Sequence, residues 1–466
     1  TKGSLKMRPS RLFAVVAVIS MAWLGGCGGG GSGGASTTTD QSAFNAGFVA
    51  YNAKNYSGAV SAFDSMIATY PGSSLVGTAY YYLGKSLYHL NDFSGAIAKF
   101  DIVLSIYPTS AFADDSLLWK GKSLQGQANI QFSAGNLPGA STLFTAARTT
   151  YQLVITSYPG TTLTPDCNYQ IGVSYYDEKN YTAAMPVLQG VLANYPAASV
   201  ADGAQYYLAR SIHGLALAAV PNYTFLQARA EYTKLMTAYP ASNWVDNAQY
   251  QIGKTYYDEL NYAVAILEFN KVLANYAALS SADDAQYYKA RSIHALALVA
   301  TPTYTLPLAR AEYAKLRTTY PASTYVDNAQ YQIGKTYYDE LSYALAIVEF
   351  DKVLVNYASL SSADDAQYYK ARSMHALALT ITPSYTLAQA RAEYAKLIAN
   401  YPASIFVDNA AYHSAFTYHD STQCLPELTA MQTFVSMYPV SFYVTAANTH
   451  ISDLLSVPHL THTTCI

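Results

Sequence analysis

Apolar residues of two sizes recur along much of the chain at the spacing of α-helices. In residues 248–305, Ile252, Gly253 and Tyr256 share one face of a helix, and Ala265 and Phe269 share one face of a second helix. Small residues at Gly253 and Ala265 would let two antiparallel helices approach closely, and Phe269 would fill the space beside them. A Tyr-Ala or Tyr-Pro pair then closes the unit. The pattern predicts a helical hairpin.

The hairpin pattern is repeated. Residues 248–305 return almost unchanged as residues 329–386, with a constant offset of 81. Similar patterns can be followed through about ten hairpins, each with one small residue on its first helix: Gly47, Gly84, Gly121, Gly172, Ala209, Gly253, Ala290, Gly334, Ala371 and Ala415. Because a repeat buries its apolar face only against its neighbours, a chain of 466 residues can fold in this way without one large core.

The joints between hairpins have a constant length. A proline or alanine lies thirteen residues before the next small residue, and proline ends a helix. Polar residues near the joints are expected to cap the next first helix: Ser73, Ser110, Asp246, Ser281, Asp327, Ser362 and Asp408. Thr224, Thr305 and Thr386 are expected to cap second helices.

Alternate hairpins carry insertions. Fourteen residues are added in the third hairpin, and seven in the fifth, seventh and ninth. Seven residues correspond to about two turns at 3.6 residues per turn, so we expect one additional turn on each helix of the latter three. Taller hairpins would then alternate with shorter ones.

Along a hairpin the sequence places an aromatic residue, then Leu-Gly, Tyr and Ala, then Phe or Tyr, and last a proline. This order of residues resembles the tetratricopeptide repeat (TPR). The form Tyr-Pro-x-Ser-x-x-x-Asp-x-Ala at residues 239–248 and 320–329 resembles the repeats of the BamD and YbgF families of outer-membrane lipoproteins. The resemblance covers about residues 42–455. It implies an all-α, right-handed TPR superhelix of about ten hairpins, with a C-terminal cap helix. It also implies a protein-binding scaffold in envelope biogenesis, either barrel-assembly-like or Tol-Pal-associated.

The N-terminus has the layout of a secretory signal. Basic residues precede an apolar run over residues 12–24. The sequence Leu24-Gly25-Gly26-Cys27 resembles a bacterial lipobox, which implies that Cys27 carries the lipid anchor. The expected divisions are a signal peptide at 1–26, a Gly/Ser/Thr-rich tether at 27–41, the repeat array at 42–440, and a capping helix and tail at 441–466. Gly28, and not an aspartate, follows Cys27. In the lipoprotein pattern that this segment resembles, absence of the aspartate implies that the protein is anchored in the outer membrane, facing the periplasm or the cell exterior.

Composition narrows the function. Charged residues make up 12% of the chain and the formal net charge is −3, which argues against a nucleic-acid partner because that would call for a basic stripe. Tyrosine is abundant, with 45 residues. No nucleophile elbow, dinucleotide fingerprint, haem-attachment motif or distinctive carboxylate pair is present. We therefore expect a non-enzymatic protein without a cofactor.

Polar and aromatic residues recur on a second face of the first helices, which lines the concave groove in TPR proteins. This set, called here the first-helix ladder, comprises Tyr81, Lys85, Tyr88, Tyr206, Arg210, His213, Tyr250, Lys254, Tyr257, Asp258, Tyr287, Arg291, His294, Tyr331, Lys335, Tyr338, Asp339, Tyr368, Arg372 and His375. It could bind envelope proteins, extended peptide segments or a glycan such as peptidoglycan. Alternatively, its cations and aspartates pair across neighbouring hairpins and are structural. Low charge and near-identical tandem copies also suit a third reading, self-association into fibres or a surface layer.

Cysteine and histidine gather near the C-terminus. A disulfide between Cys424 and Cys465 suits an oxidising envelope and would leave Cys167 unpaired. The pattern His459-x-x-His462-x-x-Cys465 offers metal-binding groups, but it lacks a second spaced pair. We therefore expect no metal.

Overall fold

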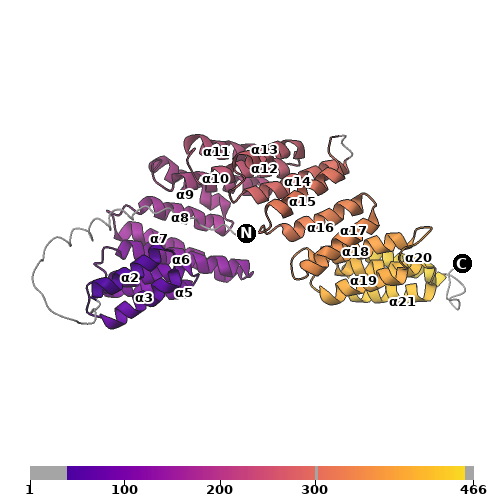
Figure 1. The fold of residues 1–466 in the computed structure, drawn as a ribbon, viewed down its shortest axis with the longest axis horizontal. Coiled ribbons are helices and arrows are strands. Elements are labelled where there is room, and N and C mark those ends of the chain that lie inside the picture. Colours follow the sequence, from indigo (N-terminus) through magenta and orange to yellow (C-terminus); the bar gives the residue numbers. More distant parts are fainter. Residues whose placement is uncertain (1–38, 300–302, 457–466) are drawn as a thin grey trace, which may run out of the picture. The chain divides into compact units, whose positions relative to one another are not determined.

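The computed structural model describes residues 39–299 and 303–456, which fold into helices joined by short turns. Consecutive helices pack against each other as hairpins (Figure 1). The described residues contain ten hairpins followed by one further helix, as the repeat count predicted. The predicted signal peptide and tether lie outside the described residues.

The chain divides into two compact units between Trp244 and Val245. The first unit contains five hairpins, whose helices are α2 (Asp40–Asn52), α3 (Tyr56–Thr69), α4 (Val76–His89), α5 (Phe93–Ile106), α6 (Ala113–Ser133), α7 (Leu137–Ser157), α8 (Thr164–Asp177), α9 (Tyr181–Asn194), α10 (Ala201–Leu217) and α11 (Phe225–Ala238).

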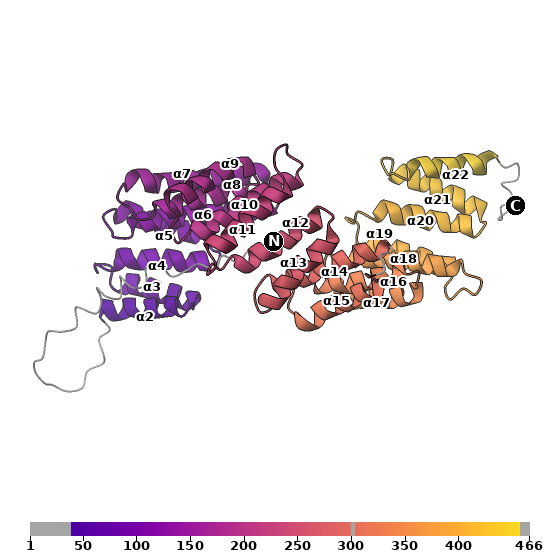
Figure 2. The ribbon, with the colours of Figure 1, turned by 90° about the horizontal axis from the view of Figure 1, so that it is seen from above.

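The second unit contains the 81-residue duplication and the C-terminal hairpin (Figure 2). Its helices are α12 (Val245–Asp258), α13 (Tyr262–Asn275), α14 (Ala282–Leu298), α15 (Leu306–Thr319), α16 (Val326–Asp339), α17 (Tyr343–Asn356), α18 (Ala363–Ala378), α19 (Leu387–Asn400), α20 (Val407–Asp420), α21 (Cys424–Met437) and α22 (Val444–Ser456). Helix α22 packs on α21 as the predicted cap helix.

Each hairpin closes around a small residue and a large one. A Cβ built on Gly84 of α4 would lie 2.7 Å from a ring carbon of Phe100 in α5, so only glycine allows this approach. The short hairpins with Gly47, Gly253 and Gly334 repeat this arrangement, and Leu188 replaces the aromatic residue opposite Gly172. In the last hairpin the pair is Ala415 and Met431. In the hairpin of α14 and α15, Ala290 and Tyr313 are both fully buried in one apolar cluster. The predicted pairing of sizes is therefore confirmed.

The turn inside most hairpins, short and tall, has one conformation. The second residue after the first helix has positive φ, as at Asn91 (63°), Gly135 (80°), Leu260 (62°) and Leu341 (60°). This left-handed conformation ends helices and favours glycine or asparagine. The sequence uses leucine at two of these positions.

Hydroxyl groups near the joints connect hairpins instead of capping helices. Helix α4 begins after Leu75 without a side-chain cap, and the Ser281 side chain also makes no capping hydrogen bond. Instead, hydroxyls donate to a carboxylate in the first turn of the preceding hairpin: Ser73 to Asp40, Thr161 to Asp114, Ser242 to Asp202, Ser281 to Asp246 and Ser362 to Asp327, over 2.6 to 3.1 Å. The capping prediction was wrong for Ser73, Ser281 and Ser362 because the carboxylate lies within their reach. For the second helices it is confirmed, since Thr224, Thr305 and Thr386 accept from the backbone.

The seven-residue insertions lengthen only one helix. Helices α10 and α14 have 17 residues and α18 has 16, whereas α11, α15 and α19 keep 14. The expected extra turn on both helices was wrong because a threonine N-cap fixes the start of each second helix. The remaining residues lie between the two helices in the sequence. In the third hairpin, both α6 and α7 have 21 residues.

Candidate functional site

The inner tyrosines of the first-helix ladder are buried. Their exposed fractions lie between 2% and 8%, which removes them from contact with a ligand: Tyr81, Tyr206, Tyr250, Tyr287, Tyr331 and Tyr368. Sequence reasoning had placed these side chains in a groove.

A neighbouring aromatic ring covers several of these tyrosines. Tyr287 stacks on Tyr325 with ring centroids 4.4 Å apart and an angle of 14° between the rings. The same stacking joins Tyr206 to Trp244 and Tyr368 to Phe406. The covering residue directly precedes the first helix of the next hairpin. Sequence reasoning missed this aromatic position, although an aromatic residue stands four residues after the closing proline at several joints: Phe112, Trp244, Tyr325, Phe406 and Tyr443.

The ladder cations lie over tyrosine rings. Lys254 Nζ is 5.2 Å from the ring centre of Tyr257 and 5.0 Å from that of Tyr288. The copy repeats these distances, with Lys335 over Tyr338 and Tyr369. Contacts of this kind are worth about 0.5–2 kcal/mol, depending on exposure. Both cations and both outer tyrosines, Tyr257 and Tyr338, remain half-buried.

Acidic groups of the ladder pair within the array. Lys254 bonds to Asp258, and Lys335 bonds to Asp339 in the same way. Asp339 also lies 3.0 Å from Nε2 of His294 in the preceding hairpin. Burial raises the pKa of Asp339, but hydrogen bonds from His294 and Lys335 outweigh burial and lower this pKa overall. The contact of His375 with Asp420, at 2.6 Å, occupies the corresponding place one block later.

Two ladder arginines differ from the lysines. Within the described residues, Arg291 and Arg372 form no ion pair with a carboxylate. The Arg291 guanidinium lies 5.4 Å from the ring centre of Tyr257 and 5.8 Å from that of Tyr287. Arg372 donates to the hydroxyl of Tyr368 over 3.2 Å. Both guanidinium groups are half-buried, so each combines a fixed positive charge with an aromatic surround.

The first unit presents a different set of cations. Lys85 and Lys122 each lie 4.7 Å from the ring centre of Trp119. Burial lowers the pKa of Lys85 to about 8, although Asp115 opposes this shift and Lys122 adds to it. Burial also lowers the pKa of Lys122. Sequence reasoning identified Lys85 but missed Lys122 and Trp119, because α6 does not repeat the residue pattern of the other first helices.

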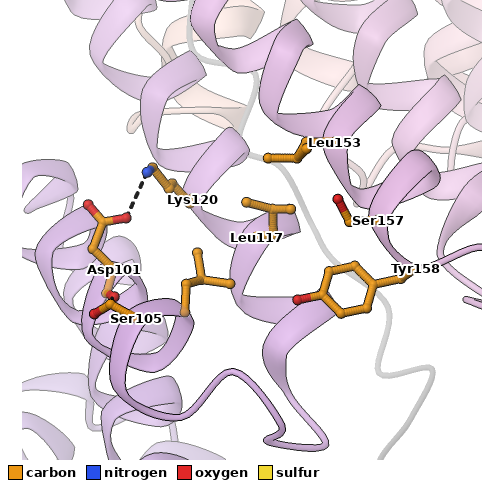
Figure 3. A pocket seen from close by; sticks show the side chains of 8 residues that line it. Asp101, Ser105, Leu117, Lys120, Leu153, Ser157 and Tyr158 are labelled. Carbon is orange, nitrogen blue, oxygen red and sulfur yellow. Dashed lines mark hydrogen bonds and ion pairs between the residues drawn. The ribbon is translucent and has the colours of Figure 1, made fainter.

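A shallow pocket lies away from the ladder. Figure 3 shows this space of about 450 Å³ between α5, α6 and α7. An ion pair of 2.7 Å between Lys120 and Asp101 borders it. The other lining residues are Leu104, Ser105, Leu117, Leu153, Ser157 and Tyr158. Because the pocket is open and contains no ladder residue, it does not form a site with the ladder.

Three predictions about cysteine and histidine involve residues outside the described part. Cys27, Cys465, His459 and His462 all lie there. Cys424 is buried at the start of α21, and its pairing with Cys465 stays a prediction. Cys167 is a buried free thiol whose pKa is raised to about 12, mainly by burial. A thiol held in this protonated form is a poor nucleophile.

Consecutive hairpins with these buried small and aromatic positions define a TPR protein, and residues 166–198 match the model of one tetratricopeptide repeat. The chain belongs to the YfiO family of outer membrane lipoproteins, whose model matches residues 36–168 and 303–456. This finding confirms the predicted relationship to BamD-type lipoproteins. No curated protein matches the sequence.

Solved structures with a similar arrangement include several TPR proteins. The C-terminal part of a TPR protein from Cytophaga hutchinsonii is 15% identical, with a TM-score of 0.44 over 60% of this chain and 98% of that one. A TPR protein from Parabacteroides merdae is 12% identical, with a TM-score of 0.43 over 64% and 98%. Yeast Tom70 is 10% identical, with a TM-score of 0.41 over 90% and 95%.

A helix that spans a membrane is long and apolar throughout. Within residues 39–299 and 303–456, no helix is both long enough and apolar enough to cross a bilayer.

Proposed function

We propose that this protein is a lipid-anchored, non-enzymatic scaffold of the outer membrane that binds an extended protein segment along its first helices. Family membership supports the lipid anchor, for which Cys27 is the candidate. The TPR architecture supports a protein partner. Envelope biogenesis is the proposed setting, as in barrel assembly or a Tol-Pal-associated role.

The observation that carries this proposal is the recurrence of Arg291 and Arg372. Each guanidinium is half-buried among tyrosines and forms no ion pair with a carboxylate of the described chain. Buried charges are normally paired, and arginine binds carboxylates through two parallel hydrogen bonds. A segment with acidic side chains at matching intervals would therefore be recognised by the duplicated hairpins.

The same geometry favours a protein segment over a glycan. Sugar rings stack on open aromatic faces, but the six inner tyrosines are buried and cations cover Tyr257 and Tyr338. The charged groups remain the more available part of the ladder.

Site-specific photo-cross-linking in intact cells tests the proposal. A photoreactive phenylalanine at Tyr257 or Tyr338 should capture one distinct envelope protein. The same group at Leu267 or Val348, which are exposed on second helices, should not capture it. A series of adducts between copies of this protein, formed from the first-helix positions, would instead support self-association.

A charge-matched pair of variants then tests the arginines. The double variant Arg291→Ala/Arg372→Ala should abolish the adduct. The control Lys271→Ala/Lys352→Ala removes two cations that are also 81 residues apart but lie on second helices, with side chains 55% and 47% exposed. Equal adducts from both double variants would overturn the assignment of the arginines.

A further inference from the structure

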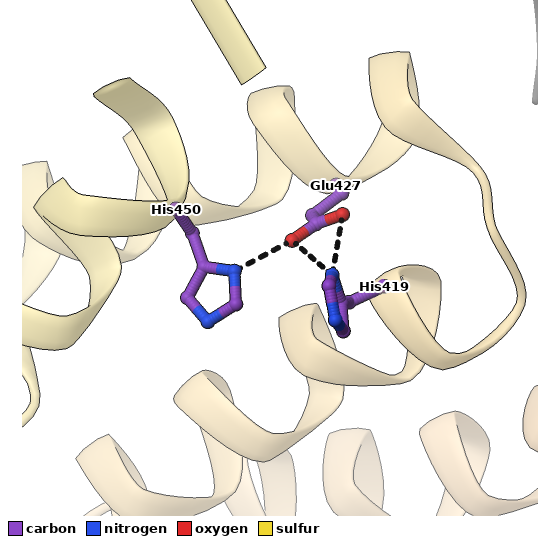
Figure 4. A group of neighbouring side chains, drawn as sticks. All are labelled: His419, Glu427 and His450. Atoms are coloured by element: carbon purple, nitrogen blue, oxygen red, sulfur yellow. Dashed lines mark hydrogen bonds and ion pairs between the residues drawn. The ribbon is translucent and has the colours of Figure 1, made fainter. Parts of the chain in front are cut away.

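Three side chains from the last three helices point toward one another. Figure 4 shows His419, Glu427 and His450, which come from α20, α21 and α22. Oε1 of Glu427 lies 3.2 Å from Nδ1 of His419 and 3.1 Å from Nδ1 of His450. These three atoms all lie within 4.8 Å of one another. Sequence reasoning had noted the histidines of this region but not Glu427.

The carboxylate is in an unusual setting. The Glu427 side chain is fully buried. Its Oε2 is in hydrogen-bond contact with Nδ1 of His419 over 3.3 Å, whereas its Oε1 has no hydrogen-bond partner among the described residues. Burying a carboxylate is costly unless it is paired or coordinates a metal. The close histidine nitrogens therefore surround an acceptor atom whose hydrogen-bonding capacity is unused.

The two separations between histidine nitrogen and carboxylate oxygen match those of ligands around one metal ion. Zinc bonds to histidine nitrogen and carboxylate oxygen are about 2.0–2.2 Å long, so tetrahedral ligands lie about 3.3 Å apart. The two nitrogen-to-oxygen distances of 3.2 and 3.1 Å are close to this value. The His419 side chain is 49% exposed, so an ion can reach the site from solvent.

We propose that His419, Glu427 and His450 bind a divalent transition-metal ion of the zinc class. Two imidazoles and one carboxylate suit this class, whereas magnesium and calcium prefer oxygen ligands. Three protein ligands leave one position for water. Because each ligand comes from a different helix, the ion fastens the cap helix α22 to the last hairpin.

Metal titration of the purified mature chain, carrying no polyhistidine tag, tests this site. Calorimetry with Zn²⁺ alone should give one ion per chain, and Co²⁺ should give the visible absorption of a tetrahedral complex. Zn²⁺ should also slow amide hydrogen exchange in α22 specifically. Absence of stoichiometric Zn²⁺ binding would overturn the proposal.

Variants separate this site from other histidines. His419→Gln, at an exposed side chain, and His450→Gln should each abolish stoichiometric binding and the protection of α22. Glu427→Gln should do the same, and circular dichroism checks that each variant remains folded. His294→Gln, which alters a histidine paired with Asp339, should bind normally. If binding persisted in His419→Gln/His450→Gln but was lost in His459→Gln/His462→Gln, the ion would belong to the tail and the proposal would be wrong.

Discussion

Gly253 of α12 and Phe269 of α13 are so close that a Cβ on the glycine would lie 2.7 Å from two ring carbons. Phe269 is fully buried, so its ring has no free space to enter. Gly253→Ala should therefore lower the free energy of unfolding by about 1–3 kcal/mol, as expected for an overpacked core. Urea denaturation measures this change.

Gly190 provides the matched control. It lies within α9, and a Cβ there would meet no atom within 4 Å. Gly190→Ala should raise stability by about 0.5–1 kcal/mol because alanine favours the helix. If both alanine variants changed stability in the same direction, close packing would not explain the glycine at 253.

Two buried tyrosines should respond oppositely to loss of the hydroxyl. The Tyr151 hydroxyl donates to Oε1 of Gln125 over 2.9 Å, whereas the Tyr313 hydroxyl has no hydrogen-bond partner among the described residues. Tyr151→Phe should cost about 0.5–1.5 kcal/mol. Tyr313→Phe should be neutral or stabilising, because it removes a buried polar group that is unpaired. Thermal unfolding of the two variants gives the comparison, and an equal loss in both would contradict it.

Replacing Leu341 should stabilise the folded chain. Its φ is 60° and its side chain is 70% exposed, so it bears backbone strain without much compensating burial. Asparagine tolerates this conformation better, and Asn91 occupies the equivalent turn between α4 and α5. Leu341→Asn should raise the free energy of unfolding by about 0.5–1 kcal/mol. Leu345→Asn, at an exposed position inside α17, should instead lower it slightly because asparagine disfavours helix.

Lys85 should give a signature in the dependence of stability on pH. Burial lowers its pKa to about 8 in the folded chain, against about 10.4 when unfolded. Between these values the unfolded state holds a proton that the folded state lacks, so stability rises with pH across this window. The difference in unfolding free energy between wild type and Lys85→Met should therefore shift in favour of wild type from pH 8 to pH 10. Lys234→Met, at an exposed lysine of the same unit, is the control; an identical trend there would count against the assignment.

Much of the fold could be predicted because the small and aromatic residues contact each other within a single hairpin. Gly253 and Phe269 belong to one hairpin, so their spacing alone predicted their contact. The first-helix ladder was harder, because burial of Tyr287 depends on Tyr325 from the next hairpin. Helical spacing predicts which residues share a face, but not whether an adjacent ring covers them.

The C-terminal site illustrates the same limit. His419 and Glu427 are eight residues apart, but His450 reaches them only because α22 packs on α21. No regular spacing links three ligands on three helices. The tail pattern His459-x-x-His462 could be recognised because its spacing is regular. The three residues of the structural cluster have no regular spacing in the sequence.

The hydrogen bonds from Ser281 to Asp246 and from Ser362 to Asp327 have the same length, 3.1 Å. Each block of 81 residues therefore carries its own acceptor near its start and its own donor near its middle, so this hydrogen bond is complete within one block. If one whole block were lost or gained, the new junction would have the same sequence pattern as the old one, and no buried serine or aspartate would lose its hydrogen-bond partner. Length should consequently vary among close relatives in steps of 81 residues, and the number of ladder arginines should change with each step.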